Sequence, residues 1–165
     1  MDAFDPRPIC RVLNEHGVDY VVVGGFAAVL HGSALPTADV DVVPSRDDGN
    51  LDRLGAALQV LDARLRTAAG PVEAPLDGPF LRAMPLMVNL STRYGDLDVA
   101  FEPAGPRRGF DDWDADASEV EIADGLRIRV ASLDAIIDSK RAAGRQKDER
   151  ALPHLESLRD EIGPD

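Results

Sequence analysis

The sequence predicts an α/β (α+β) fold in which helices flank a small mixed β-sheet. Residues 18–23 and 38–43 are short, valine-rich runs, which are typical of buried strands. Leucines recur at spacings of three and four over residues 51–65, and this spacing places them on one face of a helix. With 165 residues, 44% of them hydrophobic, the chain has the size of a single domain, 1–165.

Start and stop signals place the first elements. Asp5 followed by Pro6 suits the start of a helix, and Gly17 ends it. After the first valine-rich strand, a glycine pair leads into residues 26–32. This segment contains alanine and no β-branched run, so we expect a brief helix before the second valine-rich strand.

The middle of the chain predicts one helix, a loop and a hairpin. The Pro- and Gly-rich residues 68–79 predict a surface loop. Residues 86–92 and 96–101 predict two strands joined by a turn at 93–95. The helix before the loop should cover the sheet with five leucines, which are Leu51, Leu54, Leu58, Leu61 and Leu65.

A second hairpin is expected over residues 119–130, because Asp124-Gly125 is a strong turn signal between two apolar runs. The stretch that leads up to and into this turn, residues 109–124, has seven carboxylates and no Lys or Arg. We interpret it as a solubilising surface with Trp113 packed against the body of the protein. A role in binding a partner is the alternative.

The C-terminal part, residues 132–162, should be helical, and the core should lie in residues 18–130. Ser132 can cap a helix. A last helix is expected from about Asp148, where Pro153 can introduce a kink.

Composition limits the function. The net charge of −12 argues against tight non-specific binding of nucleic acid, which depends mainly on Lys and Arg, but residues 140–150 carry five basic side chains and can form a basic edge. The start of the sequence resembles no signal peptide, and no stretch approaches a membrane span. Cys10 is the single cysteine, which excludes an internal disulfide framework. We therefore expect a cytoplasmic protein.

Four aspartates lie in predicted strands. Side chains alternate along a strand, so Asp39 and Asp41 share one face, and so do Asp96 and Asp98. Like charges held this close raise each other's pKa unless a cation neutralises them. Three such carboxylates can hold two Mg²⁺ ions, one to activate an attacking oxygen and one to stabilise a leaving phosphate.

The glycine pair, Gly24 and Gly25, lies at the end of the first strand and leads into the brief helix. Such a turn lets a phosphate approach the backbone closely and offers it N–H groups. Alone the pair is a weak signal, because two glycines after a strand usually form an ordinary turn. Beside the aspartates it indicates a nucleotide site.

These motifs together resemble the DNA polymerase β-type nucleotidyltransferase superfamily. The superfamily has a strand, Gly-Gly or Gly-Ser, about a dozen residues, Asp-x-Asp, and a third Asp on a later strand. More narrowly, "GGFAAVLHGSALPTADVDVV" with the downstream "ASLDAIIDSKRAAGRQKDERALPHLESLR" resembles small bacterial nucleotidyltransferases related to abortive-infection toxins and minimal nucleotidyltransferase antitoxins. The resemblance covers residues 18–159.

The resemblance implies a nucleotidyltransferase fold and assigns roles by position. Asp39 and Asp41 would bind Mg²⁺, and Asp98 would be the third carboxylate, which positions or deprotonates the acceptor hydroxyl. Gly24 and Gly25 would face the phosphates of an NTP substrate. One departure weakens the match, because Leu35 stands where many relatives have an Arg.

Other polar residues have a functional and a structural interpretation. Ser33 and Thr37 can touch phosphate or metal, but loop hydroxyls usually bond to local backbone. Lys140 continues an apolar helix stripe and must reach solvent or meet an anion, and the family pattern favours the anion. Lys147 belongs to the same pattern but can be a solvated charge. His31 is more typical of a packing residue than of a base.

Two functions follow. The first is Mg²⁺-dependent transfer of NMP from an NTP to a hydroxyl of an RNA, such as the 3′ end of tRNA, or of a protein, in a toxin–antitoxin or phage-defence setting. A small-molecule acceptor is less expected, because little chain remains for a second substrate domain. The other function is a catalytically weakened fold that binds a cognate partner, which the departure at Leu35 favours.

Overall fold

The structure is a computed structural model that describes residues 4–163. Its strands are β1 (Tyr20–Val23), β2 (Asp39–Pro44), β3 (Arg64–Thr67), β4 (Gly70–Val72), β5 (Met87–Thr92), β6 (Gly95–Ala100), β7 (Ser118–Ala123) and β8 (Leu126–Val130). Its helices are α1 (Arg7–Glu15), α2 (Gly24–Leu30), α3 (Asp48–Val60), α4 (Gly78–Ala83), α5 (Gly109–Ala115), α6 (Leu133–Ala143) and α7 (Gln146–Ile162).

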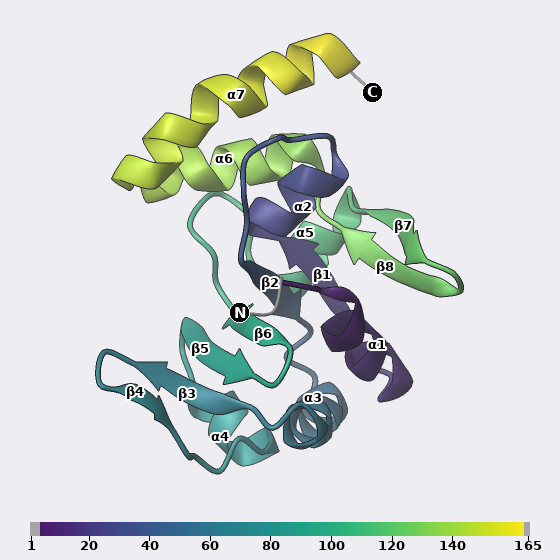
Figure 1. Ribbon diagram of the computed structural model, residues 1–165, viewed down its shortest axis with the longest axis vertical. Helices are drawn as coiled ribbons and strands as arrows, with labels where there is room; N and C mark the ends of the chain where they lie inside the picture. Colours follow the sequence, from purple (N-terminus) through teal and green to yellow (C-terminus); the bar gives the residue numbers. More distant parts are fainter. Residues whose placement is uncertain (1–3, 164–165) are drawn as a thin grey trace.

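The eight strands form one mixed sheet in the order β4-β3-β5-β6-β2-β1-β8-β7 (Figure 1). The β2–β6 and β1–β8 pairs are parallel, and the other neighbours are antiparallel. The predicted α/β class and mixed sheet are therefore confirmed. The sheet is larger than predicted, because β3 and β4 extend it beyond β5.

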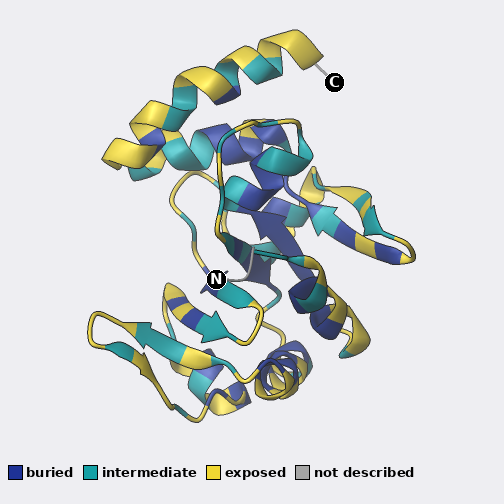
Figure 2. Ribbon diagram, viewed as in Figure 1, coloured by how far each residue is buried: buried dark blue, intermediate teal, exposed yellow. Residues whose placement is uncertain are grey.

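The core lies around the central strands. All four residues of β1 are buried, and in β2 the side chains alternate between half-buried aspartates and buried valines before the strand enters the core (Figure 2). Helix α2 packs on β1, β2 and α6, while α6 packs along α7 at one end of the molecule (Figure 1). Trp113 of α5 is buried, as the sequence predicts.

Both hairpins are confirmed, with turns between β5 and β6 and between β7 and β8. The Ser132 cap is also confirmed, because its hydroxyl accepts a hydrogen bond from the Ala135 N–H at 3.0 Å. Helix α7 begins two residues earlier than predicted, at Gln146, and continues through Pro153. None of the described helices is both long and apolar enough to cross a membrane.

The prediction for Leu65 was wrong. Helix α3 ends at Val60, and Asp62 adopts a left-handed conformation with φ of 54°, which no helix can continue through. Leu65 therefore lies in β3, where it pairs with Leu90 and Val72. The other four leucines of the predicted stripe are buried as expected.

The predicted surface loop at 68–79 was also wrong in part. Residues 70–72 form β4, which pairs with β3, and the Thr67 hydroxyl donates a hydrogen bond to the Gly70 carbonyl across the turn. Helix α4 then begins at Gly78, where the Asp77 carboxylate accepts a hydrogen bond from the Phe80 N–H. The acidic segment contains helix α5, whose Asp111 and Asp112 are exposed, in agreement with the predicted surface.

Candidate metal and nucleotide site

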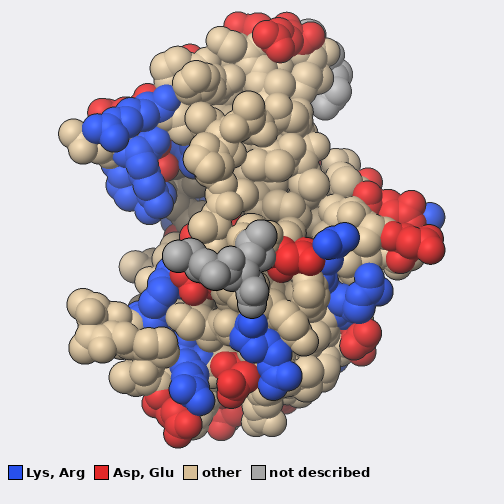
Figure 3. All heavy atoms as spheres, viewed as in Figure 1, with Lys and Arg blue, Asp and Glu red and all other residues tan. Residues whose placement is uncertain are grey.

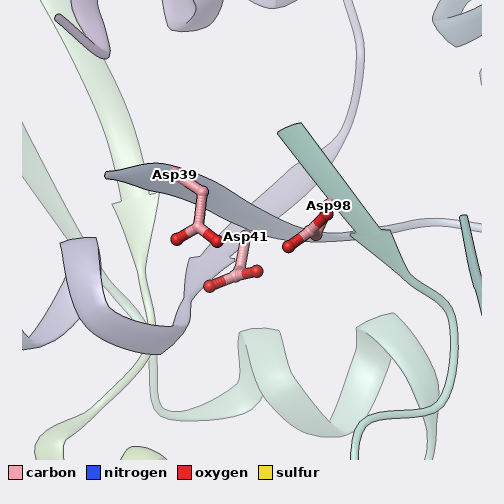
Figure 4. Close-up of side chains that lie close together, drawn as sticks. All are labelled: Asp39, Asp41 and Asp98. Carbon is pink, nitrogen blue, oxygen red and sulfur yellow. The ribbon is translucent and has the colours of Figure 1, made fainter. Parts of the chain in front are cut away.

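Three of the four strand aspartates meet at one place. The parallel register of β2 and β6 pairs Asp39 with Asp96 and Asp41 with Asp98. Asp39, Asp41 and Asp98 each offer one oxygen, and these oxygens all lie within 4.8 Å of one another (Figure 4). A trio of carboxylate oxygens at this spacing suits a hard divalent cation such as Mg²⁺.

Burial makes this cluster costly without a cation. Asp98 is 8% exposed, and Asp39 and Asp41 are half-buried. Burial and then the charges of Asp39 and Asp98 raise the pKa of Asp41 to about 8. Burial and the neighbouring Asp98 also raise the pKa of Asp39. The protein thus holds these carboxylates together against their mutual repulsion, an arrangement that a bound metal would stabilise.

The glycine turn lies against the same aspartates. Gly24 has a φ of +70°, and a Cβ atom on it would overlap the carboxylate of Asp41. A Cβ on Gly25 would lie 3.1 Å from the Thr37 hydroxyl. Both glycines therefore have a steric reason to be small, and Gly24 brings the start of α2 directly against Asp41.

The side chains of Ser33, Thr37 and His31 each contact backbone groups of the protein. The Ser33 hydroxyl accepts a hydrogen bond from the Leu35 N–H at 3.2 Å, and the Thr37 hydroxyl donates to the Asp39 carbonyl at 3.3 Å. His31 Nε2 lies 2.7 Å from the Ala131 carbonyl oxygen, so this ring bridges α2 to the start of α6. The expectation that His31 is a packing residue agrees with this contact.

Lys140 meets an anion, but the anion belongs to the protein. Its Nζ lies 3.5 Å from Asp148 Oδ1, and Arg145 Nε binds Asp148 Oδ2 at 2.7 Å. The Asp148 side chain is fully buried. Burial alone would raise the pKa of Asp148, but the hydrogen bonds from Arg145 and the charges of Arg145 and Lys140 lower it overall. The sequence alone did not single out Asp148 as a buried anchor.

Lys147 differs from Lys140, because it is exposed and its charge lowers the pKa values of both Asp39 and Asp41. The first turn of α7 thus contributes positive potential to the carboxylate cluster. In Figure 3, Lys and Arg side chains gather where α6 and α7 meet, and the surface is hollowed between this region and the β3–β4 end of the sheet.

One residue of the site escaped sequence analysis entirely. Arg66 of β3 binds Asp98 Oδ1 through Nη2 at 2.8 Å and lies 3.5 Å from Asp96 Oδ2 through Nη1. Asp96 therefore pairs with the same arginine as Asp98. The only sequence signal for Arg66 is the polar–apolar alternation Arg64-Leu65-Arg66, which is typical of a strand. The leucine spacing assigned Leu65 to a helix instead, so this signal was missed.

Comparison with solved structures shows the fold. A lincosamide antibiotic adenylyltransferase, LnuA with lincomycin bound, aligns over 96% of this chain and 100% of its own, with a TM-score of 0.63 and 18% identity. The Thermotoga maritima protein TM1012 gives a TM-score of 0.57 at 16% identity, covering 93% of this chain and 91% of its own. ANT(2″)-Ia in complex with adenylyl-2″-tobramycin gives 0.55 at 18% identity, covering 93% and 87%.

No protein-family model matches the sequence, and no curated protein matches it either. At these identities the structural likeness establishes the nucleotidyltransferase fold and nothing finer. The fold class implied by the resemblance is confirmed.

Proposed function

We propose that this protein is a Mg²⁺-dependent nucleotidyltransferase that transfers NMP from an NTP to an acceptor hydroxyl and releases pyrophosphate. The observation that carries this proposal is the meeting of Asp39, Asp41 and Asp98 on adjacent parallel strands, beside the Gly24 turn. In this proposal, residues 1–165 form one nucleotidyltransferase-like domain.

The proposed roles follow from position. Asp39, Asp41 and Asp98 would hold Mg²⁺ in a two-metal site, where the metal supplies positive charge to the reacting phosphate. Asp98 would position the acceptor hydroxyl or take its proton. The hydroxyl oxygen forms a bond to the α-phosphorus, and the bond from that phosphorus to the bridging oxygen of pyrophosphate breaks. Gly24 and Gly25 would lie against the phosphates.

The remaining candidates have supporting roles in this proposal. Lys147 would add positive charge beside the triphosphate, in agreement with its influence on the aspartates. Lys140 would act through Asp148 rather than by touching the nucleotide. Ser33 and Thr37 would shape the loop before β2 through their backbone hydrogen bonds.

The acceptor we favour is a hydroxyl of a small molecule. The length of this chain leaves room for one, in agreement with the lincomycin-bound LnuA, which aligns over its full length with 96% of this chain. A net charge of −12 also disfavours an RNA acceptor. An RNA end or a protein hydroxyl, in a toxin–antitoxin or phage-defence setting, is an alternative outcome of the same test.

The test is nucleotide transfer by the purified protein. Each α-labelled NTP is incubated with Mg²⁺ and, separately, with a panel of hydroxylated antibiotics, total RNA, or cell lysate. Label on one acceptor class with the wild type, and none with Asp39→Ala/Asp41→Ala, would identify donor and acceptor together. The matched control, Asp160→Ala/Glu161→Ala, removes two carboxylates at the far end of α7 and should transfer normally.

A second function has specific support. Leu35 replaces the expected Arg, and Arg66 already occupies the third carboxylate. Both features suit a weakened enzyme that binds a cognate toxin or antitoxin. Absence of label with every NTP, from folded protein, would overturn the enzyme proposal. A stoichiometric partner retained equally by wild type and Asp39→Ala/Asp41→Ala would then support the binding function.

A further inference from the structure

Arg66 makes three contacts at the carboxylate cluster. Its Nη2 donates to Asp98 Oδ1 at 2.8 Å, its Nη1 donates to the Leu90 carbonyl at 2.9 Å, and the same Nη1 lies 3.5 Å from Asp96 Oδ2. The side chain comes from β3, two strands away from Asp98, and crosses β5 to reach it. Both terminal nitrogens of the Arg66 guanidinium, Nη1 and Nη2, therefore have hydrogen-bond partners.

The contact with Asp98 involves one of the three carboxylates that lie within reach of a single cation. The Asp98 side chain is only 11% exposed, so water contributes little to its neutralisation. A charge-assisted hydrogen bond at 2.8 Å is among the stronger interactions that a carboxylate makes. Arg66 thus supplies part of the positive charge that a metal ion would supply to Asp98.

The other contacts of Arg66 do not depend on Asp98. The Leu90 carbonyl belongs to β5, and Asp96 lies two residues before Asp98 on β6, outside the three-carboxylate group. If Asp98 turned to a metal, the guanidinium would retain these two partners. The cost of releasing Asp98 is therefore one hydrogen bond rather than the whole anchorage of the arginine.

We propose that Arg66 is the resident counter-cation of Asp98 and competes with the divalent cation for this carboxylate, so that Arg66 sets how tightly the site binds metal. This inference rests on the proposed metal site. It makes Arg66 a positioning residue: it holds Asp98 in place before the metal binds and releases it when the metal binds.

The experiment measures binding of Mg²⁺ and of Mn²⁺ by calorimetry, without nucleotide, to the wild type, Arg66→Met and Arg64→Met. Arg64 lies on the same strand and the same face, and its removal changes the net charge equally. Its Nη2 lies 3.9 Å from Glu73 Oε1, away from the cluster. Arg66→Met should bind metal about three to ten times more tightly than the wild type, whereas Arg64→Met should stay within about twofold.

Thermal unfolding supplies a second readout. In chelator, Arg66→Met should unfold at a lower temperature than the wild type, because Asp98 loses its counter-cation, and saturating Mg²⁺ should remove most of this difference. Arg66→Lys keeps the positive charge but lacks the two-pronged guanidinium group. Its metal affinity should fall between those of the wild type and Arg66→Met. It also covers the case in which Arg66→Met fails to fold.

The outcomes separate the two proposals. Metal binding by the wild type with no gain in Arg66→Met and Arg66→Lys, or with an equal gain in Arg64→Met, would overturn the competition and leave the proposed metal site standing. Absence of metal binding in all folded variants would overturn the metal site and, with it, the role of Arg66.

Discussion

Gly24 and Asp41 lie so close together that a Cβ atom on the glycine would overlap the carboxylate of the aspartate. Gly24 also has a φ of +70°, which residues other than glycine rarely adopt. The turn that starts α2 and the carboxylate cluster on β2 are therefore one packed unit. A substitution at Gly24 should therefore displace the Asp41 carboxylate first.

Gly24→Ala should weaken Mg²⁺ binding by at least about tenfold, because Asp41 must move away from Asp39 and Asp98. It should also lower the free energy of unfolding by about 1–3 kcal/mol, since both strain and overlap are introduced. Gly125→Ala is the control, because Gly125 has a φ of +71° but no heavy atom within 4 Å of its Cβ position. Calorimetry and urea unfolding measure both effects. Equal metal affinity in the two variants would contradict this prediction.

Asp41→Asn should make the metal-free protein more stable than the wild type at pH 8. The pKa of Asp41 is raised from its ordinary 3.8 to about 8, so between these values the folded state binds more protons than the unfolded state. Stability contributed by this group therefore falls as pH rises from about 4 to about 8. The excess stability of Asp41→Asn over the wild type should grow across this range.

Urea unfolding in chelator at pH 5, 6, 7 and 8 measures that difference. Mg²⁺ should stabilise the wild type most at pH 8, because metal and proton compete for Asp41, and should stabilise Asp41→Asn much less. A difference between variant and wild type that is constant with pH, or that shrinks as pH rises, would contradict a raised pKa of Asp41 in the folded protein.

Lys147→Met should weaken binding of Mg²⁺ with a nucleoside triphosphate by about three to ten times while leaving binding of Mg²⁺ alone undiminished. The reason is that the Lys147 charge acts on Asp39 and Asp41 from the side of α7, where it would favour an anion and oppose a cation. Arg150→Met makes the same charge change one turn further along the helix. Calorimetry with each ligand compares the variants, and an equal loss in both would assign the effect to net charge.

The sequence predicted the central strands well, because their signals are local. The valine-rich runs of β1 and β2, and the turns of both hairpins, need no information from distant residues. Strand β4 is only Gly70–Val72 and contains Pro71, so its composition argued for a loop. Only its pairing with β3 makes it a strand.

The candidate site likewise contains residues that local patterns predict and residues that only the packing of distant elements brings in. Alternation along a strand predicted that Asp39 and Asp41 share a face, and the β2–β6 register then brings Asp98 beside Asp41. Arg66 reaches the site only because β3 lies next to β5, a neighbourhood that no local pattern indicates. Asp148 is a similar case, because its burial depends on how α6 and α7 pack.

Asp148→Asn should lower the free energy of unfolding by about 2–4 kcal/mol, because it removes the buried charge that Lys140 and Arg145 neutralise. The pKa of Asp148 is lowered overall by these partners, so its contribution is present above the ordinary value of 3.8 and is lost as pH falls below it. The variant and the wild type should therefore converge in stability under acid conditions.

The control is Asp160→Asn, which replaces an exposed carboxylate on the same helix. It should change the free energy of unfolding by less than about 0.5 kcal/mol. Urea unfolding at pH 7 and pH 3 makes the comparison, and a loss at pH 7 no larger than that of Asp160→Asn would mean that the Asp148 cluster does not anchor α7.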